Sequence, residues 1–296
     1  MRERRTGHTP ASGLRTVATE AVAVVLGVVV YFGVRGITAV DPGAAREHAR
    51  DILALERTLG LDLEAGTQDL VVQVDWLVTV ANWVYIWGHW PVIAVTLVYL
   101  ALHDRTLFLR LRNAMIASGG LGLCVYTTYP VAPPRLLGEG YVDTVSERSN
   151  AYRVLQPPAF TNQYAAMPSL HVGWDLLVGL AVFCVATTVV MRTVGLLMPV
   201  LMTAATVMTA NHYVLDVLAG AALALVGWAM ARWIERRRLS RSGPDKSGAP
   251  PDEPEPVAPR TSVPSPVPSP VPVPPPRRAE SARRDDPVRC RAAGAP

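Results

Sequence analysis

The sequence predicts an all-α integral membrane protein, a bundle of six membrane-spanning helices followed by a disordered Pro-rich C-terminal tail. Half of the 296 residues are hydrophobic, and the mean hydropathy is +0.24. The apolar residues gather into stretches of about 20, the length that an α-helix needs to cross a bilayer. Clusters of Arg flank these stretches and account for the net charge of +4. This pattern is typical of membrane anchors and not of a nucleic-acid-binding surface.

Five stretches are long and apolar enough to be spanning helices: Val17–Gly36, Asn113–Tyr129, Ser169–Met191, Val194–Ala210 and Val214–Trp233.

A further apolar stretch, Leu70–His103, is interrupted by polar residues. If Arg2–Arg5 is cytoplasmic, the cluster Arg105–Arg112 should be cytoplasmic too, because basic flanks favour that side. A single crossing at Tyr85–His103 satisfies this condition, with Leu70–Val84 lying along the outer surface. The prediction is therefore six crossings with both termini in the cytoplasm.

The chain divides into three predicted parts. Residues 1–15 form a basic cytoplasmic N-terminus, residues 16–236 the membrane-embedded domain, and residues 237–296 a cytoplasmic tail. Most of the 26 prolines lie from Pro244 onward, a composition that cannot bury a core. The first apolar run lacks a small-residue cleavage site, so it is interpreted as a membrane helix and not as a removable signal.

Ala44–Leu63 is polar enough to be an external helix. We expect it to rest on the membrane through a stripe of large aliphatic residues, namely Ile52, Leu53, Leu55, Leu59 and Leu61. One interpretation of this helix is a lip that guides a substrate; the other is a helix that simply lies on the bilayer.

Two histidines stand at the ends of apolar stretches, in A-A-M-P-S-L-H at Ala165–His171 and in A-N-H-Y-V-L-D at Ala210–Asp216. Ionisable groups near a bilayer are costly, so they usually serve function. His212 and Asp216 are four residues apart, a spacing that on a helix puts both side chains on one face. A carboxylate that holds one imidazole nitrogen leaves the other free for chemistry. The pair predicts a membrane enzyme with a histidine nucleophile.

Groups that suit a phosphate lie beside these motifs. Prolines in Y-P-V-A-P-P-R, at Tyr129–Arg135, break the helix as it leaves the membrane and put Arg135 on the outer face. The planar guanidinium gives a phosphate two directed hydrogen bonds, although a snorkelling interfacial arginine is the alternative. Ser169 begins a helix, where unpaired N–H groups attract anions, unless it serves only as an N-cap. No metal-ligand spacing occurs, so we expect no metal or other cofactor.

The blocks P-P-R, A-M-P-S-L-H and N-H-Y-V-L-D-V-L-A-G resemble the three signature blocks of the type-2 phosphatidic acid phosphatase superfamily. The Ser-Leu-His form and the Asn-His-Tyr lead-in are closest to its inositol phosphorylceramide synthase-like branch. The resemblance implies a metal-independent reaction in which His212 attacks phosphorus, Asp216 orients it and His171 protonates the leaving oxygen. It also implies that Arg135 and Ser169 hold the phosphate.

The resemblance extends over Leu53–Trp233, with departures. The superfamily has a Ser-Arg pair upstream of its third-block histidine, where this chain has Ala205 and Thr206. One cation is therefore missing, and Arg148 or Arg153 in the outer loop is a candidate replacement.

Three polar residues near the histidines have no role fixed by the resemblance. Asn211 precedes His212 and is a further candidate contact. Asp175, four residues after His171, either raises the proton affinity of that histidine or pairs with another polar helix residue. His89 lies among several Trp residues and belongs either to an interfacial aromatic belt or to a substrate contact.

The predicted function is phosphoryl transfer from a lipid phosphate through a phosphohistidine, at the extracytoplasmic face of the cell membrane. With water as acceptor the protein is a phosphatase, which we favour because excluding water needs specialised lids. With an alcohol as acceptor it is a head-group transferase of the inositol-phosphate type. A different class is a non-catalytic haem-binding membrane protein with His171 and His212 as axial ligands. A transporter would instead have broken helices at the midplane.

Overall fold

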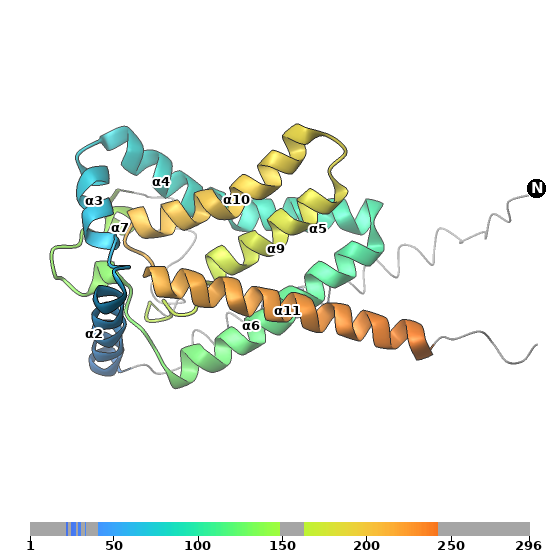
Figure 1. Cartoon of the computed structure of the whole chain (residues 1–296), viewed down its shortest axis with the longest axis horizontal. Helices are drawn as coiled ribbons and strands as arrows, with labels where there is room; N and C mark the ends of the chain where they lie inside the picture. Colours follow the sequence, from blue (N-terminus) through green and yellow to red (C-terminus); the bar gives the residue numbers. More distant parts are fainter. Residues whose placement is uncertain are drawn as a thin grey trace, which may run out of the picture. The chain divides into compact units, whose positions relative to one another are not determined.

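The described residues form helices joined by loops (Figure 1). This computed structural model describes residues 41–148 and 163–241, together with residues 22, 25–27, 29–30 and 33. The elements are α2 (Pro42–Leu59), α3 (Glu64–Val72), α4 (Asp75–Trp87), α5 (Trp90–His103), α6 (Arg105–Thr128), the 3-10 helix η1 (Pro134–Leu136), α7 (Thr144–Arg148), α9 (Leu170–Val185), α10 (Val189–Met208) and α11 (Val214–Arg241). These two long ranges contain helices and no strand, which confirms the all-α prediction for them.

Fewer helices than predicted qualify as membrane spans by length and composition. Within the described part of the chain, Val189–Met208 and Val214–Ser240 qualify alone. α4 and α5 qualify together, as one span bent by 41°. α9 is apolar but has only 16 residues. The described residues thus offer two or three candidate spans and not six. The predicted first helix lies mostly outside the described residues, as do residues 242–296 of the tail.

The predicted crossing at Tyr85–His103 is not one helix but is divided between α4 and α5. Helix α4 ends at Trp87, and His89 has the non-helical dihedrals φ −99° and ψ −86° before α5 begins. Pro91 lies in the first turn of α5, where its missing N–H does no harm but where it prevents α4 from continuing. Leu70–Val84, predicted to lie along the outer surface, is divided between α3 and α4, and α4 packs against α10.

The predicted boundary near Arg192 is also wrong, because α9 and α10 are separated by residues 186–188. The side chain of Thr188 accepts a hydrogen bond from the N–H of Met191 at 3.3 Å and so caps α10. Arg192 therefore lies in the first turn of α10. Its Nε donates to the carbonyl of Ala186, at the end of α9, at 3.3 Å.

Helix α2 does not rest on the membrane through the whole predicted stripe. Ile52 and Leu53 are 6% and 1% exposed and belong to a buried cluster with Val131 and Tyr213. Leu55 and Leu59 are exposed. In Figure 1, α2 and α3 lie at the end of the bundle where α11 begins. The buried half of the stripe therefore attaches α2 to the protein.

Glycines allow the motif-bearing helices to approach closely. A Cβ on Gly173 of α9 would lie 2.6 Å from the carbonyl oxygen of Gly220 on α11, and one on Gly195 of α10 would lie 2.7 Å from that of Gly179 on α9. Small residues at such crossings are typical of membrane helices, where close backbone packing replaces the hydrophobic driving force.

We expect Gly220→Ala to destabilise the protein, by about 1–3 kcal/mol. The new Cβ would overlap the carbonyl oxygen of Ser169, and a backbone contact cannot be relieved by rotating a side chain. The measurement is thermal unfolding in detergent. Gly120→Ala is the matched control, because Gly120 also lies within a helix but has nothing within 4 Å of its added Cβ. Equal melting temperatures for the two variants would contradict this account of the crossing.

Candidate functional site

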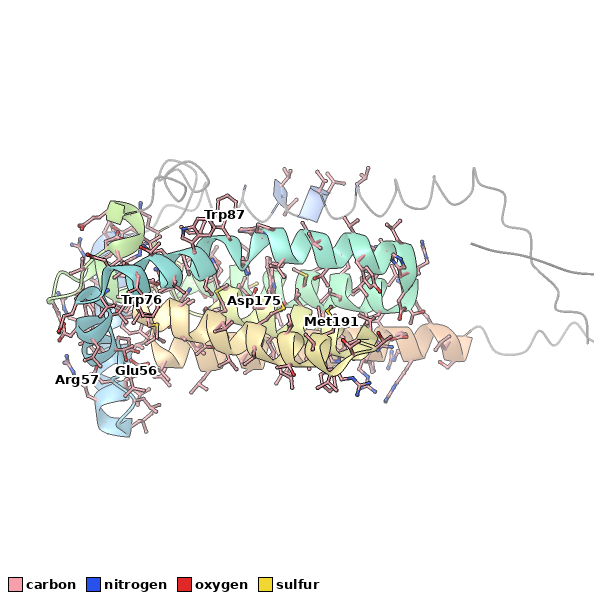
Figure 2. All side chains as sticks on the ribbon, turned by 90° about the horizontal axis from the view of Figure 1, so that it is seen from above. Glu56, Arg57, Trp76, Trp87, Asp175 and Met191 are labelled. Carbon is pink, nitrogen blue, oxygen red and sulfur yellow. The ribbon has the colours of Figure 1, made fainter. Side chains whose placement is uncertain are left out.

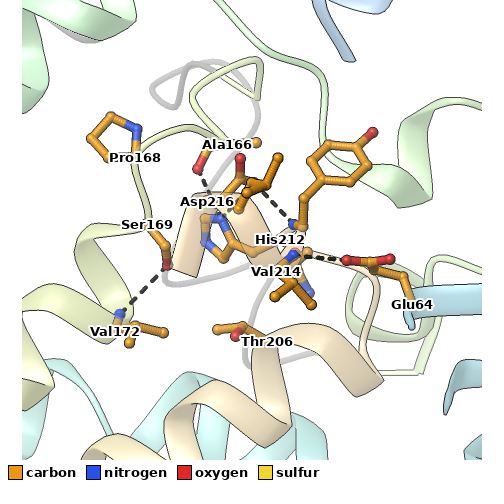
Figure 3. Close-up of polar contacts among 12 residues, drawn as sticks. Glu64, Ala166, Pro168, Ser169, Val172, Thr206, His212, Val214 and Asp216 are labelled. Carbon is orange, nitrogen blue, oxygen red and sulfur yellow. Dashed lines mark hydrogen bonds and ion pairs between the residues drawn. The ribbon is translucent and has the colours of Figure 1, made fainter. Parts of the chain in front are cut away.

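The three sequence motifs meet at the end of the bundle where α10 ends and α11 begins. Figure 3 shows the second and third motifs there, with Ala166 and Ser169 beside His212 and Asp216. Each pair of motifs is joined by a main-chain hydrogen bond, from Ala166 N to Val131 O at 3.1 Å, from Arg135 N to Ala210 O at 2.9 Å and from Ser169 N to Asp216 O at 2.9 Å. Motifs that are far apart in the sequence are therefore fixed against one another by the backbone itself.

His212 lies in the turn between α10 and α11 and is 5% exposed. The turn is tight, since Ala210 has a positive φ of 51°. The Nδ1 atom of His212 lies 2.9 Å from the carbonyl oxygen of Ala166. A carbonyl oxygen can only accept, so Nδ1 carries the proton in the neutral ring and Nε2 keeps its lone pair. This tautomer is the one that a nucleophilic or basic Nε2 requires.

Asp216 is not the nearest partner of His212, contrary to the prediction. His212 precedes α11 and Asp216 lies in its first turn, so the two do not share a helical face as predicted. The distance from His212 Nδ1 to Asp216 Oδ2 is 3.5 Å, longer than that to Ala166. Oδ2 accepts instead from the N–H of Tyr213 at 3.0 Å, which is half of a capping box. The carboxylate therefore fixes the start of α11 and stands near the imidazole as a charge.

His171 stands in the first turn of α9, next to His212. Their ring centroids are 5.7 Å apart, and the ring of His171 also stacks on that of Tyr85 at 4.6 Å. The structure thus brings together the two histidines that the sequence singled out.

Ser169 is the N-cap of α9. Its Oγ accepts from the N–H of Val172 at 3.5 Å, and its own N–H donates to the carbonyl of Asp216. This amide is therefore already paired, so the expected cradle of unpaired N–H groups does not include it. Ser169 is fully buried, beside Pro168, which follows a cis peptide bond.

Arg135 lies on η1 with its side chain 6% exposed. Its Nε donates to Oδ1 of Asn211 at 2.8 Å, and its Nη1 donates to Oδ2 of Asp143 at 2.6 Å. The guanidinium is thus tied to the residue that precedes His212. The sequence analysis did not identify Asp143 as a partner of Arg135. The feature that could have suggested it is that Asp143 follows Arg135 by eight residues, in the same Gly-containing loop.

Asp175 pairs with His89, the second of the two alternatives that its sequence position left open. Nδ1 of His89 donates to Oδ1 of Asp175 at 2.8 Å, and both side chains are 3% exposed. Asp175 lies inside the bundle, whereas Trp76 and Trp87 project from α4 (Figure 2). His89 is therefore a core residue and not part of an exposed aromatic belt.

A comparison with protein families matches residues 50–230 to the model of the PAP2 superfamily. The chain belongs to the PAP2 superfamily. This agrees with the resemblance to type-2 phosphatidic acid phosphatases, and it supports a phosphatase-type activity on a lipid phosphate in a membrane protein. Neither the curated proteins nor the solved structures contain a significant match to the chain.

Between α6 and α9, Arg135 is the only Lys or Arg whose side chain is described, so no further described cation there replaces the missing PAP2 cation. Ala205 and Thr206 are both buried in α10, where the superfamily pattern has Ser-Arg. The backbone of Arg148 ends α7, but its side chain, like all of Arg153, lies outside the described residues. Among the described residues, no group of three His, Cys, Asp or Glu side chains is arranged to hold a metal ion.

Two buried glutamates, which sequence reasoning missed, cap the helix that follows His212. Oε1 of Glu64 accepts from the N–H of Val214 at 2.7 Å, and Oε1 of Glu56 accepts from that of Leu215 at 2.6 Å. Both residues are 0% exposed. Carboxylates are favourable at a helix N-terminus because they pair with free N–H groups and with the helix dipole. The glutamates attach α2 and α3 to the start of α11.

Burial raises the pKa of Glu56 from 4.5 to about 8, and the nearby charges of Glu64 and Asp216 act in the same direction. Burial is also the main reason that the pKa of Glu64 is raised. Since the folded state favours protonated Glu56, the stability that this group contributes is full below a pH of about 4.5 and is lost as the pH rises to about 8.

Glu56→Gln should therefore flatten the fall in melting temperature between pH 5 and pH 8. Gln keeps the oxygen that accepts from Leu215 but cannot ionise. The measurement is thermal unfolding in detergent across this range. Glu47→Gln, on the exposed side of α2, is the matched control and should keep the wild-type slope. A wild-type slope in Glu56→Gln would show that another group sets the pH dependence.

Proposed function

We propose that this protein is a lipid phosphate phosphatase that works through a phosphohistidine on His212, at the extracytoplasmic face of the cell membrane. The observation that carries the proposal is the hydrogen bond from Nδ1 of His212 to the carbonyl of Ala166. It leaves the lone pair on Nε2, in a turn that also carries the partner of Arg135. Membership of the PAP2 superfamily supports the same chemistry.

The reaction has two balanced steps. Nε2 of His212 attacks phosphorus, the bond from phosphorus to the ester oxygen breaks, and that oxygen takes a proton from His171. Water then attacks the phosphohistidine, gives its proton to His171, and releases inorganic phosphate from Nε2. Each step restores the protonation state that the other needs.

Charge near His212 assists both steps. The ring becomes positive when Nε2 bonds to phosphorus, and the Asp216 carboxylate 3.5 Å from Nδ1 offsets that charge. Arg135 is held by Asn211 and Asp143 beside the same turn and offsets the negative charge of the phosphoryl group. No step calls for a metal ion.

The site is proposed to face outward because the basic ends of the helices lie opposite to it. α6 and α10 begin with basic residues and run toward the site, whereas α11 starts at the site and ends in Arg236–Arg238. Arg110 of α6 donates from Nε and Nη2 to Glu235 of α11 at 2.9 and 3.0 Å, so these basic ends are adjacent. Such ends favour the cytoplasm.

Intact cells that express the protein, given short-chain lipid phosphates that do not cross membranes, test the proposal directly. We expect phosphate release outside the cell, unchanged by EDTA. Release only after the cells are opened would reverse the orientation, and loss in EDTA restored by one metal would refute the mechanism. Phosphoryl transfer to an added alcohol in place of water would assign a head-group transferase. A haem spectrum without phosphate release would assign a haem protein.

A further inference from the structure

A second imidazole–carboxylate pair lies beside the proposed leaving-group acid. His89, in the break between α4 and α5, donates from Nδ1 to Asp175 of α9 at 2.8 Å. Its ring centroid is 4.5 Å from that of His171. The three histidine rings therefore form a row, with His171 between His89 and His212. Asp175 is hydrogen-bonded to His89, at the end of the row away from His212.

Burying the His89–Asp175 pair costs free energy, because both side chains lose their contact with water. Apart from His171 in its first turn, the rest of α9 is apolar, and Asp175 is 2% exposed within it. A buried ion pair usually stabilises no better than well-packed apolar side chains of the same volume, because both groups lose their hydration. Ionisable residues within membrane helices are therefore candidates for function, with the partner as part of the candidate site.

Two tryptophan rings, in addition to Asp175, hold the His89 ring in place. Trp174 lies parallel to the ring with centroids 6.1 Å apart, and Trp90 meets it edge-on at 5.2 Å. His171, Trp174 and Asp175 all belong to α9, so His89 contacts the stretch of that helix that presents the leaving-group acid. A shift of this ring would displace His171.

The charge of Asp175 suits the task of His171. A general acid carries a positive charge before it gives up its proton, and a carboxylate nearby offsets that charge. The other titratable groups that face this row are Tyr85, stacked on His171, and Asp216, near His212. Asp175 is hydrogen-bonded to His89, and the ring of His89 lies against that of His171. The carboxylate of Asp175 is thus near His171, as the carboxylate of Asp216 is near His212.

We propose that His89, oriented by Asp175, is a positioning residue for His171. It holds the ring of His171 toward the leaving oxygen and supplies the compensating charge of Asp175. The inference rests on the proposed function, in which His171 protonates the leaving group, and assigns that step a second pair of residues.

The test compares two esters in the same preparation of each variant. One is a lipid phosphate, whose alkoxide needs a proton to leave; the other is nitrophenyl phosphate, whose phenolate needs little. His89→Gln and Asp175→Asn should each lose about 10²-fold on the lipid phosphate, the cost of misplacing a catalytic group, and much less on the aryl ester. The ratio of the two activities does not depend on how much of the variant is folded.

His48→Ala is the matched control. Like His89, His48 is hydrogen-bonded through Nδ1, here to the carbonyl oxygen of Pro130 at 2.8 Å, and lies against an aromatic ring, that of Tyr129 at 4.0 Å. It has no place in the proposed reaction. It should change both activities by the same factor. In the double variant, adding His89→Gln to His171→Ala should cause no further loss on the lipid phosphate, because His89 acts through His171.

Equal losses on both esters in His89→Gln and Asp175→Asn, or a full additional loss in the double variant, would overturn the inference and leave the pair as packing. If His171→Ala itself shows no dependence on the leaving group, the proposed role of His171 fails first. The two failures are therefore distinguishable.

Discussion

Replacing His212 by Ala should abolish turnover of every phosphate ester, whatever its leaving group. The nucleophile takes part in the first bond to form, so no property of the ester can compensate for its loss. Removal of a covalent nucleophile from a hydrolase lowers kcat by about 10⁶-fold. The measurement is phosphate release from a lipid phosphate and from nitrophenyl phosphate, in membranes that contain equal amounts of protein.

His103→Ala is the control for this variant. His103 is exposed at the end of α5, and its Nδ1 contacts the carbonyl of Tyr99 in the same helix at 2.9 Å. It should retain wild-type turnover. Brief reaction with labelled substrate should also leave an acid-labile label on the wild-type protein and none on His212→Ala. Turnover in His212→Ala comparable with that of the wild type would remove the covalent mechanism altogether.

Hydropathy predicted the helical class of this chain better than it predicted the breaks between helices. The breaks are set by single residues whose effect depends on their position in a turn. Pro91 ends α4 because it falls where α5 begins, and Thr188 caps α10 ahead of the basic residue that suggested a boundary. A count of apolar residues averages over such positions, so it merged α4 with α5 and displaced the start of α10.

The sequence predicted which residues belong to the site, but it did not predict their hydrogen-bond partners. The spacing of His212 and Asp216 implied a direct pair, and the two lie 3.5 Å apart, but Nδ1 of His212 lies closer, at 2.9 Å, to the carbonyl oxygen of Ala166. That carbonyl comes from a segment 46 residues away in the sequence. A local sequence pattern cannot predict this hydrogen bond, because every residue has the same main-chain carbonyl acceptor.

Glu56 did have a signal in the sequence. It follows Ile52 and Leu53 at helical spacing, so a carboxylate stands on the apolar face of an amphipathic helix. A charged group in that position is rarely buried without a partner. Its partner, the start of α11, lies 159 residues away, so the sequence could show that Glu56 is unusual but not what it binds.

Replacing His171 by Ala should separate esters by their leaving groups. His171 is asked only to protonate the departing oxygen, a contribution of about 10²–10⁴-fold. We expect a loss of that size on a lipid phosphate, whose alkoxide leaves poorly without a proton. Nitrophenyl phosphate should lose far less, because its phenolate is already stable in water. The measurement is kcat for both esters with one membrane preparation.

His212→Ala is the comparison variant, because it should lower kcat for both esters by a similar factor. The ring of His171 lies 5.7 Å from that of His212, so its loss also leaves a space beside the nucleophile. A purely steric effect of that space would slow both esters by a similar factor. An equal loss on the two esters would therefore assign His171 to phosphate binding or packing. A loss of kcat confined to the lipid phosphate, with an unchanged KM, would assign it to the missing proton, because both esters share the same phosphoryl group and the same nucleophile.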